Sequence, residues 1–138
     1  MLYGSTIFLG AFLLFLLQPL LGKYLLPWFG GGPGVWTVCL LFFQTTLLCG
    51  YGYAHWLVSR RPRTQAVVHI ALLALALCFL PIIPHVDWKP TGGDEPVWRL
   101  LWLLTATVGV PYFALSATFQ LLQSWFFQER ASAIPYRP

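Results

Sequence analysis

Four long runs of apolar residues alternate along the chain with short segments rich in glycine, proline or charge. A helix that crosses the hydrocarbon core of a bilayer needs about 20 mostly apolar residues, and each run is of that order. The pattern therefore predicts an all-α integral membrane protein with four transmembrane helices in one membrane domain, residues 1–138. The expected spans are residues 5–26, 35–58, 66–83 and 97–123, followed by an interfacial tail over 124–138.

Glycine and proline set the expected boundaries of these helices, because they are the strongest local helix breakers. Pro27 and the glycine-rich run 30–34 end the first span, and Pro81 and Pro84 close the third. Pro111 falls inside the fourth span. A proline inside a helix removes a backbone hydrogen bond, so we expect a kink there.

Composition supports this reading of the pattern. The chain has 138 residues, of which 58% are hydrophobic and 9% are charged. Soluble domains average about 45–50% apolar and about 25% charged residues. Disordered segments are still poorer in apolar residues. The composition therefore excludes both a soluble domain and a disordered chain.

The basic residues predict how the helices are oriented. Arg60, Arg61 and Arg63 lie between the second and third apolar runs. Short loops rich in arginine and lysine stay on the cytoplasmic side of the membrane. With four spans, both termini are then expected in the cytoplasm. A cluster enclosed by two apolar runs fits a membrane loop, so we expect no nucleic-acid partner.

Polar side chains inside apolar spans are costly, so they are the first candidates for function. Gln18, Gln44 and Gln120 each need hydrogen-bond partners, and we expect them to make polar contacts between helices. Gln18 precedes a proline that frees a backbone carbonyl, so this pair could instead line a cavity. Lys23 is expected to extend its charged end to the outer interface.

Two small residues predict a close approach of helices. Gly50 and Ala54 lie four positions apart in the second span and so share one helix face. Pairs of this kind let the backbones of membrane helices pack closely. We therefore expect this face of the second helix to contact a neighbour.

His55 and His69 lie at equal distances from Pro62, the centre of the expected turn between the second and third spans. In an antiparallel helical hairpin, such positions lie at similar depth. The two rings are therefore expected near the cytoplasmic interface, where each could make a hydrogen bond. Alternatively they could bind a cofactor, because facing histidines can hold a haem iron or a chlorophyll magnesium.

The spans lack the residues that catalysis requires. No carboxylate falls inside any span, and the three cysteines follow no metal-binding spacing. A zinc site would need further ligands near the histidines. We therefore expect no enzyme, no metal and no required cofactor.

Several motifs resemble a known family. They are Gln-Pro-Leu-Leu-Gly-Lys-Tyr-Leu-Leu-Pro-Trp-Phe-Gly-Gly-Gly-Pro-Gly-Val-Trp over 18–36, Leu-Phe-Phe-Gln over 41–44, Gly-Tyr-Gly-Tyr-Ala-His over 50–55 and Leu-Ser-Ala-Thr-Phe-Gln-Leu-Leu-Gln-Ser-Trp-Phe over 115–126. This set resembles the membrane region of bacterial fused spermidine-synthase-like proteins. The resemblance implies a multi-pass protein of the bacterial cytoplasmic (inner) membrane. That family couples its membrane region to an aminopropyltransferase-like domain that would bind decarboxylated S-adenosylmethionine. The 138 residues include no such domain, so aminopropyl transfer is not expected. The chain is then either a fragment of a longer fusion or a membrane part recruited alone, and we favour a complete short protein.

Three functions are compatible with these features. The favoured one is a non-enzymatic membrane subunit that packs against and stabilises a larger membrane protein complex, with lipids and other subunits as partners. The second is a haem- or chlorophyll-binding module that uses His55 and His69. The third is half of a transporter that works as an oligomer, with Gln18, Lys23 and Gln44 along the path.

Overall fold

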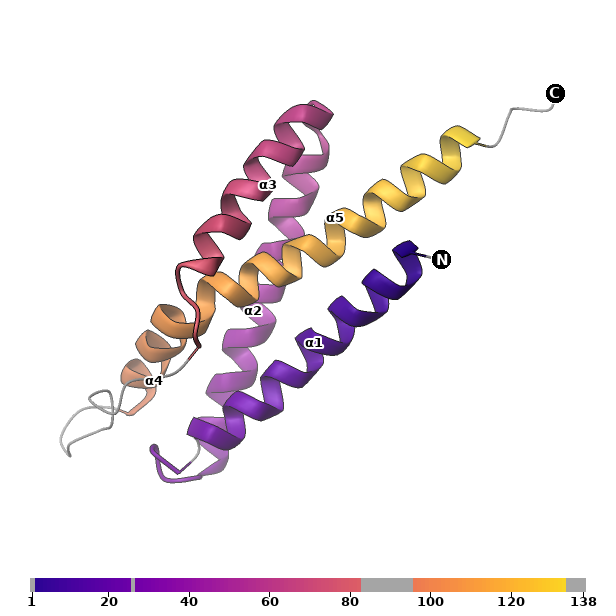
Figure 1. Cartoon of the computed structure of the whole chain (residues 1–138). Helices are drawn as coiled ribbons and strands as arrows, with labels where there is room; N and C mark the ends of the chain where they lie inside the picture. Colours follow the sequence, from indigo (N-terminus) through magenta and orange to yellow (C-terminus); the bar gives the residue numbers. More distant parts are fainter. Residues whose placement is uncertain (1, 26, 83–95, 134–138) are drawn as a thin grey trace.

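The computed structural model describes residues 2–25, 27–82 and 96–133, and all regular structure in these ranges is helical (Figure 1). The prediction of an all-α protein is thereby confirmed. Four helices are present, the last of which changes its hydrogen-bonding pattern along its length. They are α1 (Leu2–Leu25), α2 (Pro33–Val58), α3 (Pro62–Leu77) and a segment made of α4 (Pro96–Leu104), the π-helix η2 (Thr105–Gly109) and α5 (Val110–Ala133).

Three of the helices are long and apolar enough to cross a membrane, over Gly4–Leu25, Pro33–Val58 and Val97–Ala131. These correspond to the first, second and fourth expected spans. The third helix, α3, has only 16 residues. It rises about 24 Å at 1.5 Å per residue, less than the hydrocarbon thickness of about 30 Å.

The third helix differs from the expected span among the described residues: α3 covers Pro62–Leu77, whereas the span was expected over 66–83, and residue 83 lies outside the described residues. It begins early because Pro62 occupies the first helical turn, where its missing N–H is no loss. It ends early because the residue before a proline is driven out of the helical conformation, and here that proline is Pro81. Between the end of α3 and Pro81 the backbone forms tighter turns, with hydrogen bonds from residue i to residue i−3 such as Leu80 N to Leu77 O at 3.2 Å.

The turn between α1 and α2 depends on glycine. Gly30 and Gly31 have φ angles of 89° and 64°. Residues with a Cβ rarely adopt this left-handed region. The glycine-rich run that predicted a break therefore supplies the backbone conformations that reverse the chain.

The helix accommodates Pro111 by a local change in its backbone hydrogen-bonding pattern. The π-helical turn Thr105–Gly109 ends just before it. A proline cannot donate to the carbonyl four residues back, and its ring crowds that carbonyl, so a wider turn relieves the conflict. The helix then continues to Ala133, so the expected tail from residue 124 is helical over its first ten positions.

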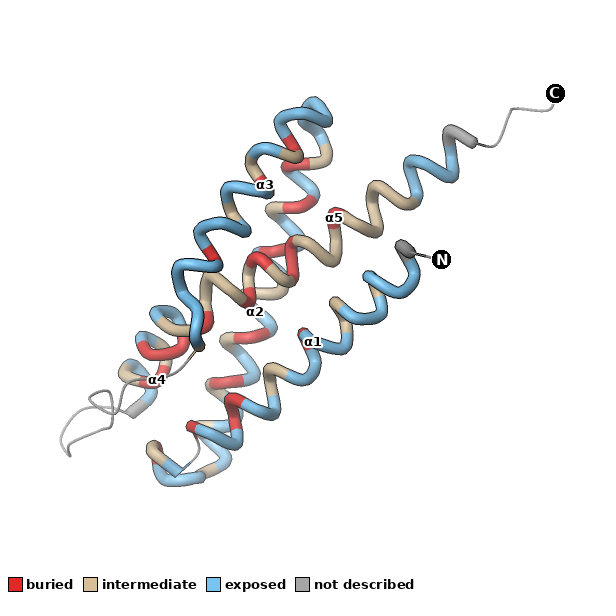
Figure 2. The backbone as a smooth tube through the Cα atoms, viewed as in Figure 1, coloured by how far each residue is buried: buried red, intermediate tan, exposed pale blue. Residues whose placement is uncertain are grey.

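Helix α5 is the centre of the packing, in contact with α1, α2 and α3. In Figure 2 the buried positions concentrate along α5 and the face of α2 that it covers, whereas α1 is largely exposed. In Figure 1 the turn between α2 and α3 lies toward the same end as the start of α1 and the end of α5. The main core joins residues of α1, α2, α4, η2 and α5, and its buried members include Leu25, Phe43, Leu103, Val108 and Tyr112.

Candidate functional site

A hydrogen bond between two side chains joins α1 to α5 in the apolar core. The Nε2 of Gln18 donates a hydrogen bond of 2.7 Å to the hydroxyl of Tyr112. Tyr112 is fully buried, and its ring lies 4.9 Å from that of Phe43, centroid to centroid. Gln18 therefore has the interhelical partner that its sequence position predicted, and the core hydroxyl is satisfied.

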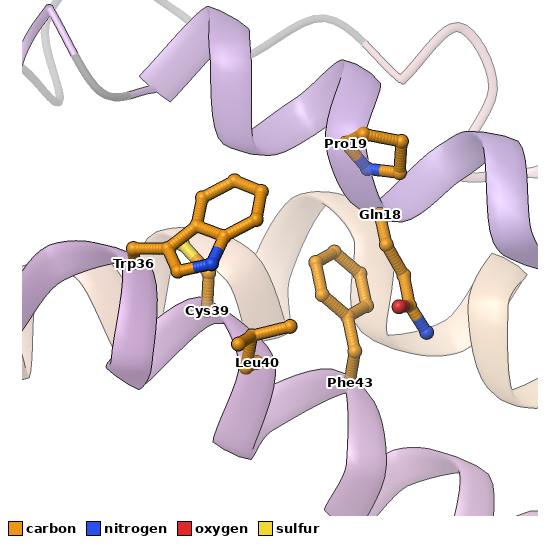
Figure 3. Close-up of a pocket in the computed structure, with 6 residues that line it drawn as sticks. All are labelled: Gln18, Pro19, Trp36, Cys39, Leu40 and Phe43. Carbon is orange, nitrogen blue, oxygen red and sulfur yellow. The ribbon is translucent and has the colours of Figure 1, made fainter. Parts of the chain in front are cut away.

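Two cavities flank Gln18. The smaller, about 70 Å³, lies between α1 and the first half of α2 (Figure 3). Its walls are almost entirely apolar, since Gln18 is joined there by Pro19, Trp36, Cys39, Leu40 and Phe43. Pro19 thus lies beside a cavity, as the alternative interpretation of the Gln-Pro pair predicted.

The larger cavity, about 150 Å³, lies between α1, α2 and α5. It brings together Gln18 and Gln44, two residues proposed from the sequence to line a path. Two tyrosines, Tyr51 and Tyr112, also reach it, and the remaining walls are apolar. Four neutral hydrogen-bonding side chains in such a space suit a small uncharged molecule or water better than an ion.

The other proposed path residue, Lys23, is not part of either cavity. Its side chain is exposed near the end of α1. Gln44 is exposed as well, although it lines the larger cavity, and it lies near the middle of α2. Gln120 is half-buried on α5.

The small pair on α2 faces α5. Gly50 is buried so closely against it that an added Cβ would overlap Ser116 Oγ and lie 3.3 Å from the backbone nitrogen of Ala117. Ala54 is buried in a second cluster with Leu57 and Leu121. Both residues therefore lie in the contact between α2 and α5, and at Gly50 this contact is too close for a larger side chain.

The two histidines lie in different surroundings. His55 is exposed on α2, whereas His69 is buried on α3. The Nε2 of His69 lies 3.0 Å from the hydroxyl of Thr118 on α5, and that hydroxyl donates to the carbonyl of Ala114. Because the single proton of Thr118 is thus committed, Nε2 carries the proton and donates.

The other nitrogen of His69 is enclosed. Nδ1 is buried without a hydrogen-bond partner among the described residues, and so is the hydroxyl of Tyr53. The Tyr53 and His69 rings lie 6.3 Å apart, centroid to centroid. In this arrangement Nε2 of His69 is engaged with Thr118, and Nδ1 is covered by protein.

Like Tyr112 and Thr118, the buried polar residue Gln65 was not predicted from the sequence. It is 5% exposed, and its Nε2 donates to the carbonyls of Val58 and Arg60, at 3.0 and 2.8 Å. Its Oε1 accepts a 2.7 Å hydrogen bond from Nε1 of Trp125. One amide thus joins the end of α2, the start of α3 and α5. The available signal was a glutamine placed between the arginines and the third apolar run.

Metal binding has no support in the ranges that the structure describes, where no three His, Cys, Asp or Glu residues cluster. Comparison of the chain with protein-family models, with curated proteins and with solved structures gives no match. The interhelical polar contacts described above are made by amides, hydroxyls, the His69 imidazole and the Trp125 indole.

Proposed function

We propose that this protein is a non-enzymatic integral membrane subunit that packs against and stabilises a larger membrane protein complex. In this proposal all four helices cross the bacterial inner membrane, and both termini are cytoplasmic. Helix α3 is short for a span, and local thinning of the bilayer would accommodate it.

Exposure of the apolar helices supports membrane insertion. Phe8 and Phe15 on α1 are 72% and 74% exposed, and Leu48 on α2 is 69% exposed. Of the most apolar 18-residue stretch of each long helix, only 11% is buried in α1 and 17% in α2, against 44% in the last helix. Lipid tails and other membrane helices can cover such faces without cost, whereas water cannot.

Gln44 is the observation that favours a protein neighbour over lipid alone. It is exposed near the middle of α2, where lipid offers its amide no hydrogen-bond partner. A polar group on a second subunit would satisfy it. The neighbouring Thr45 is also exposed, but a threonine can return its hydroxyl to its own helix and does not need a partner.

Native gel electrophoresis in mild detergent tests this proposal. The 15.6 kDa chain should migrate within a much larger complex when extracted from its own membranes. Gln44→Leu should release it, whereas the control Thr45→Val should not. A wild-type chain that migrates alone, with no co-purifying protein, would overturn the subunit proposal.

The proposed orientation has its own test. A fluorescent protein fused after Pro138 should fold and fluoresce, because it would remain in the cytoplasm. Alkaline phosphatase at the same position should be inactive, because it needs export. The reverse pair of results would place the C-terminus outside.

Half of an oligomeric transporter is the second candidate, because Gln18 and Gln44 share the 150 Å³ cavity. Swelling of proteoliposomes in small neutral solutes would detect such a path. Gln18→Leu should then slow the flux, whereas Lys23→Ala should not, since Lys23 lies outside the cavity.

A haem or chlorophyll module has less support, because His69 is engaged with Thr118 and His55 lies exposed elsewhere. The visible spectrum of protein purified from its own membranes tests it, since either cofactor absorbs strongly. The resemblance to the spermidine-synthase-like membrane region is likewise a proposal, and it carries no aminopropyl transfer to this chain.

A further inference from the structure

Three arginines lie close in sequence where α2 ends and α3 begins, with Arg63 in the first helical turn of α3. Arg60, Arg61 and Arg63, here called the arginine turn, are all exposed. The guanidinium carbon of Arg60 lies 4.7 Å from the centre of the Trp56 ring. That stacking orients one of the three charged groups on the surface of the turn.

The backbone acceptors of this turn are already used by other donors. The side-chain amide of Gln65 occupies two of its carbonyls, and main-chain N–H groups and the hydroxyl of Ser59 occupy others. The bonds are Gln65 Nε2 to Val58 O at 3.0 Å and to Arg60 O at 2.8 Å, Arg60 N to Leu57 O at 2.9 Å, Gln65 N to Arg61 O at 3.0 Å and Ser59 Oγ to Trp56 O at 2.6 Å.

The arginines therefore need acceptors from outside the protein. A guanidinium group has five N–H donors and no acceptor. None of the three arginines donates a hydrogen bond to, or pairs with a carboxylate of, any residue in the part of the chain that is described. Three neighbouring, positively charged groups that donate hydrogen bonds suit a phosphate group, which arginine can bind through two hydrogen bonds at once.

The turn is also held in position. Trp125 on α5 donates to Gln65, so the contact that ties up the carbonyls anchors the turn to the central helix. Trp56 and Trp125 are amphipathic rings that favour the level of the lipid headgroups. The arginine turn is thus fixed beside two aromatic side chains of the kind that mark the membrane interface.

We propose that the arginine turn binds the phosphate of an anionic phospholipid headgroup in the leaflet that it faces. This inference rests on the proposed membrane insertion. A lipid is the source favoured here because the site borders exposed apolar residues, among them Trp56 at 49% and Val67 at 67%. These could contact the acyl chains of the lipid whose headgroup the arginines hold.

Lipid retention in native mass spectrometry tests the proposal. The full chain is reconstituted into vesicles of four parts phosphatidylcholine to one part phosphatidylglycerol and then extracted gently. The wild type should retain phosphatidylglycerol well above its share of the vesicle. Arg60→Gln should lower the enrichment about fivefold, the effect of one basic residue near an anionic surface. Substitution of all three arginines by glutamine should return retention to the share in the vesicle.

Two further variants make the result specific. The triple variant K23Q/R99Q/R130Q loses the same charge elsewhere and should keep most of the enrichment. Arg60→Lys keeps the charge but loses the planar group that stacks on Trp56. Its phosphatidylglycerol enrichment should therefore lie between those of the wild type and Arg60→Gln. The helical content of each variant is compared with wild type by circular dichroism.

Three results would overturn the proposal. One is undiminished enrichment in the variant that lacks the arginine turn, and another is equal loss in the control triple. The third is displacement of the lipid by excess inorganic phosphate, which would indicate a site for a free anion. If the wild type fails to float with the vesicles at all, membrane insertion itself is wrong, and that result is distinct from the other three.

Discussion

The side-chain amide of Gln18 donates a hydrogen bond of 2.7 Å to the hydroxyl of Tyr112, joining α1 to α5 across 94 positions of the sequence. Helix α1 is otherwise mostly exposed, with few buried positions such as Leu14 and Leu21. The polar contact therefore fixes where along α5 the first helix docks. Apolar packing alone specifies such a register weakly, because lipid can replace it.

A double-mutant cycle should detect this bond. We expect Gln18→Leu and Tyr112→Phe to be coupled by about 0.6 kcal/mol in the free energy of unfolding, and by no more than about 1.7 kcal/mol. Unfolding in mixed micelles with increasing denaturing detergent measures it. Gln44→Leu is the matched control, because Gln44 lines the same cavity as Tyr112 without bonding to it. Equal coupling in the control cycle of Gln44→Leu with Tyr112→Phe would contradict the hydrogen bond assigned to Gln18 and Tyr112.

The same substitution should have opposite effects at two tyrosines. The hydroxyl of Tyr112 is bonded to Gln18, whereas that of Tyr53 is buried without a partner among the described residues. An unsatisfied buried polar group costs about 1–3 kcal/mol. We therefore expect Tyr53→Phe to leave stability unchanged or to raise it, and Tyr112→Phe to lower it.

Thermal unfolding of both variants in one detergent makes the comparison direct. A loss of stability in Tyr53→Phe as large as in Tyr112→Phe would show that the Tyr53 hydroxyl has a partner. A water molecule between this hydroxyl and Nδ1 of His69 would be the first to consider, because the two rings lie 6.3 Å apart.

Gly50 and Gly52 should respond differently to one added methyl group. A Cβ at Gly50 would overlap Ser116 Oγ, whereas one at Gly52 meets nothing within 4 Å. Overpacking of a tight contact costs about 1–3 kcal/mol. We expect Gly50→Ala to destabilise the fold by that amount and Gly52→Ala to have little effect or a favourable one. Combining Gly50→Ala with Ser116→Gly should restore part of the lost stability. If it restores none, the destabilisation does not come from overlap with the Ser116 side chain.

Loss of the Gln65 amide should destabilise the end of the bundle that carries the arginine turn. Gln65→Leu removes three hydrogen bonds and leaves two carbonyls and the Trp125 indole to find other partners. We expect a loss of about 1–3 kcal/mol in the free energy of unfolding. Gln123→Leu is the control, since Gln123 is only half-buried on α5. Equal stability of the two variants would contradict the role assigned to Gln65.

The expectation about the histidines shows where local reasoning stops. Equal spacing from Pro62 predicted that His55 and His69 lie at similar depth in a simple hairpin. In the fold, however, both α2 and α3 pack mainly on α5. His69 accordingly meets Thr118, a residue 49 positions away. The side of each helix that is covered depends on this third helix, which hairpin geometry does not include.

The sequence by itself determined the all-helical class, three of the four membrane-length helices that it predicted and the glycine turn, because long apolar runs and backbone breakers act locally. Only the tertiary structure decided the partners of Gln18, Gly50 and Gln65. In a chain this apolar, nearly every helix face is hydrophobic enough to be buried. Which faces meet is therefore set by close fit at small residues and by a few hydrogen bonds, and both depend on residues far apart in the sequence.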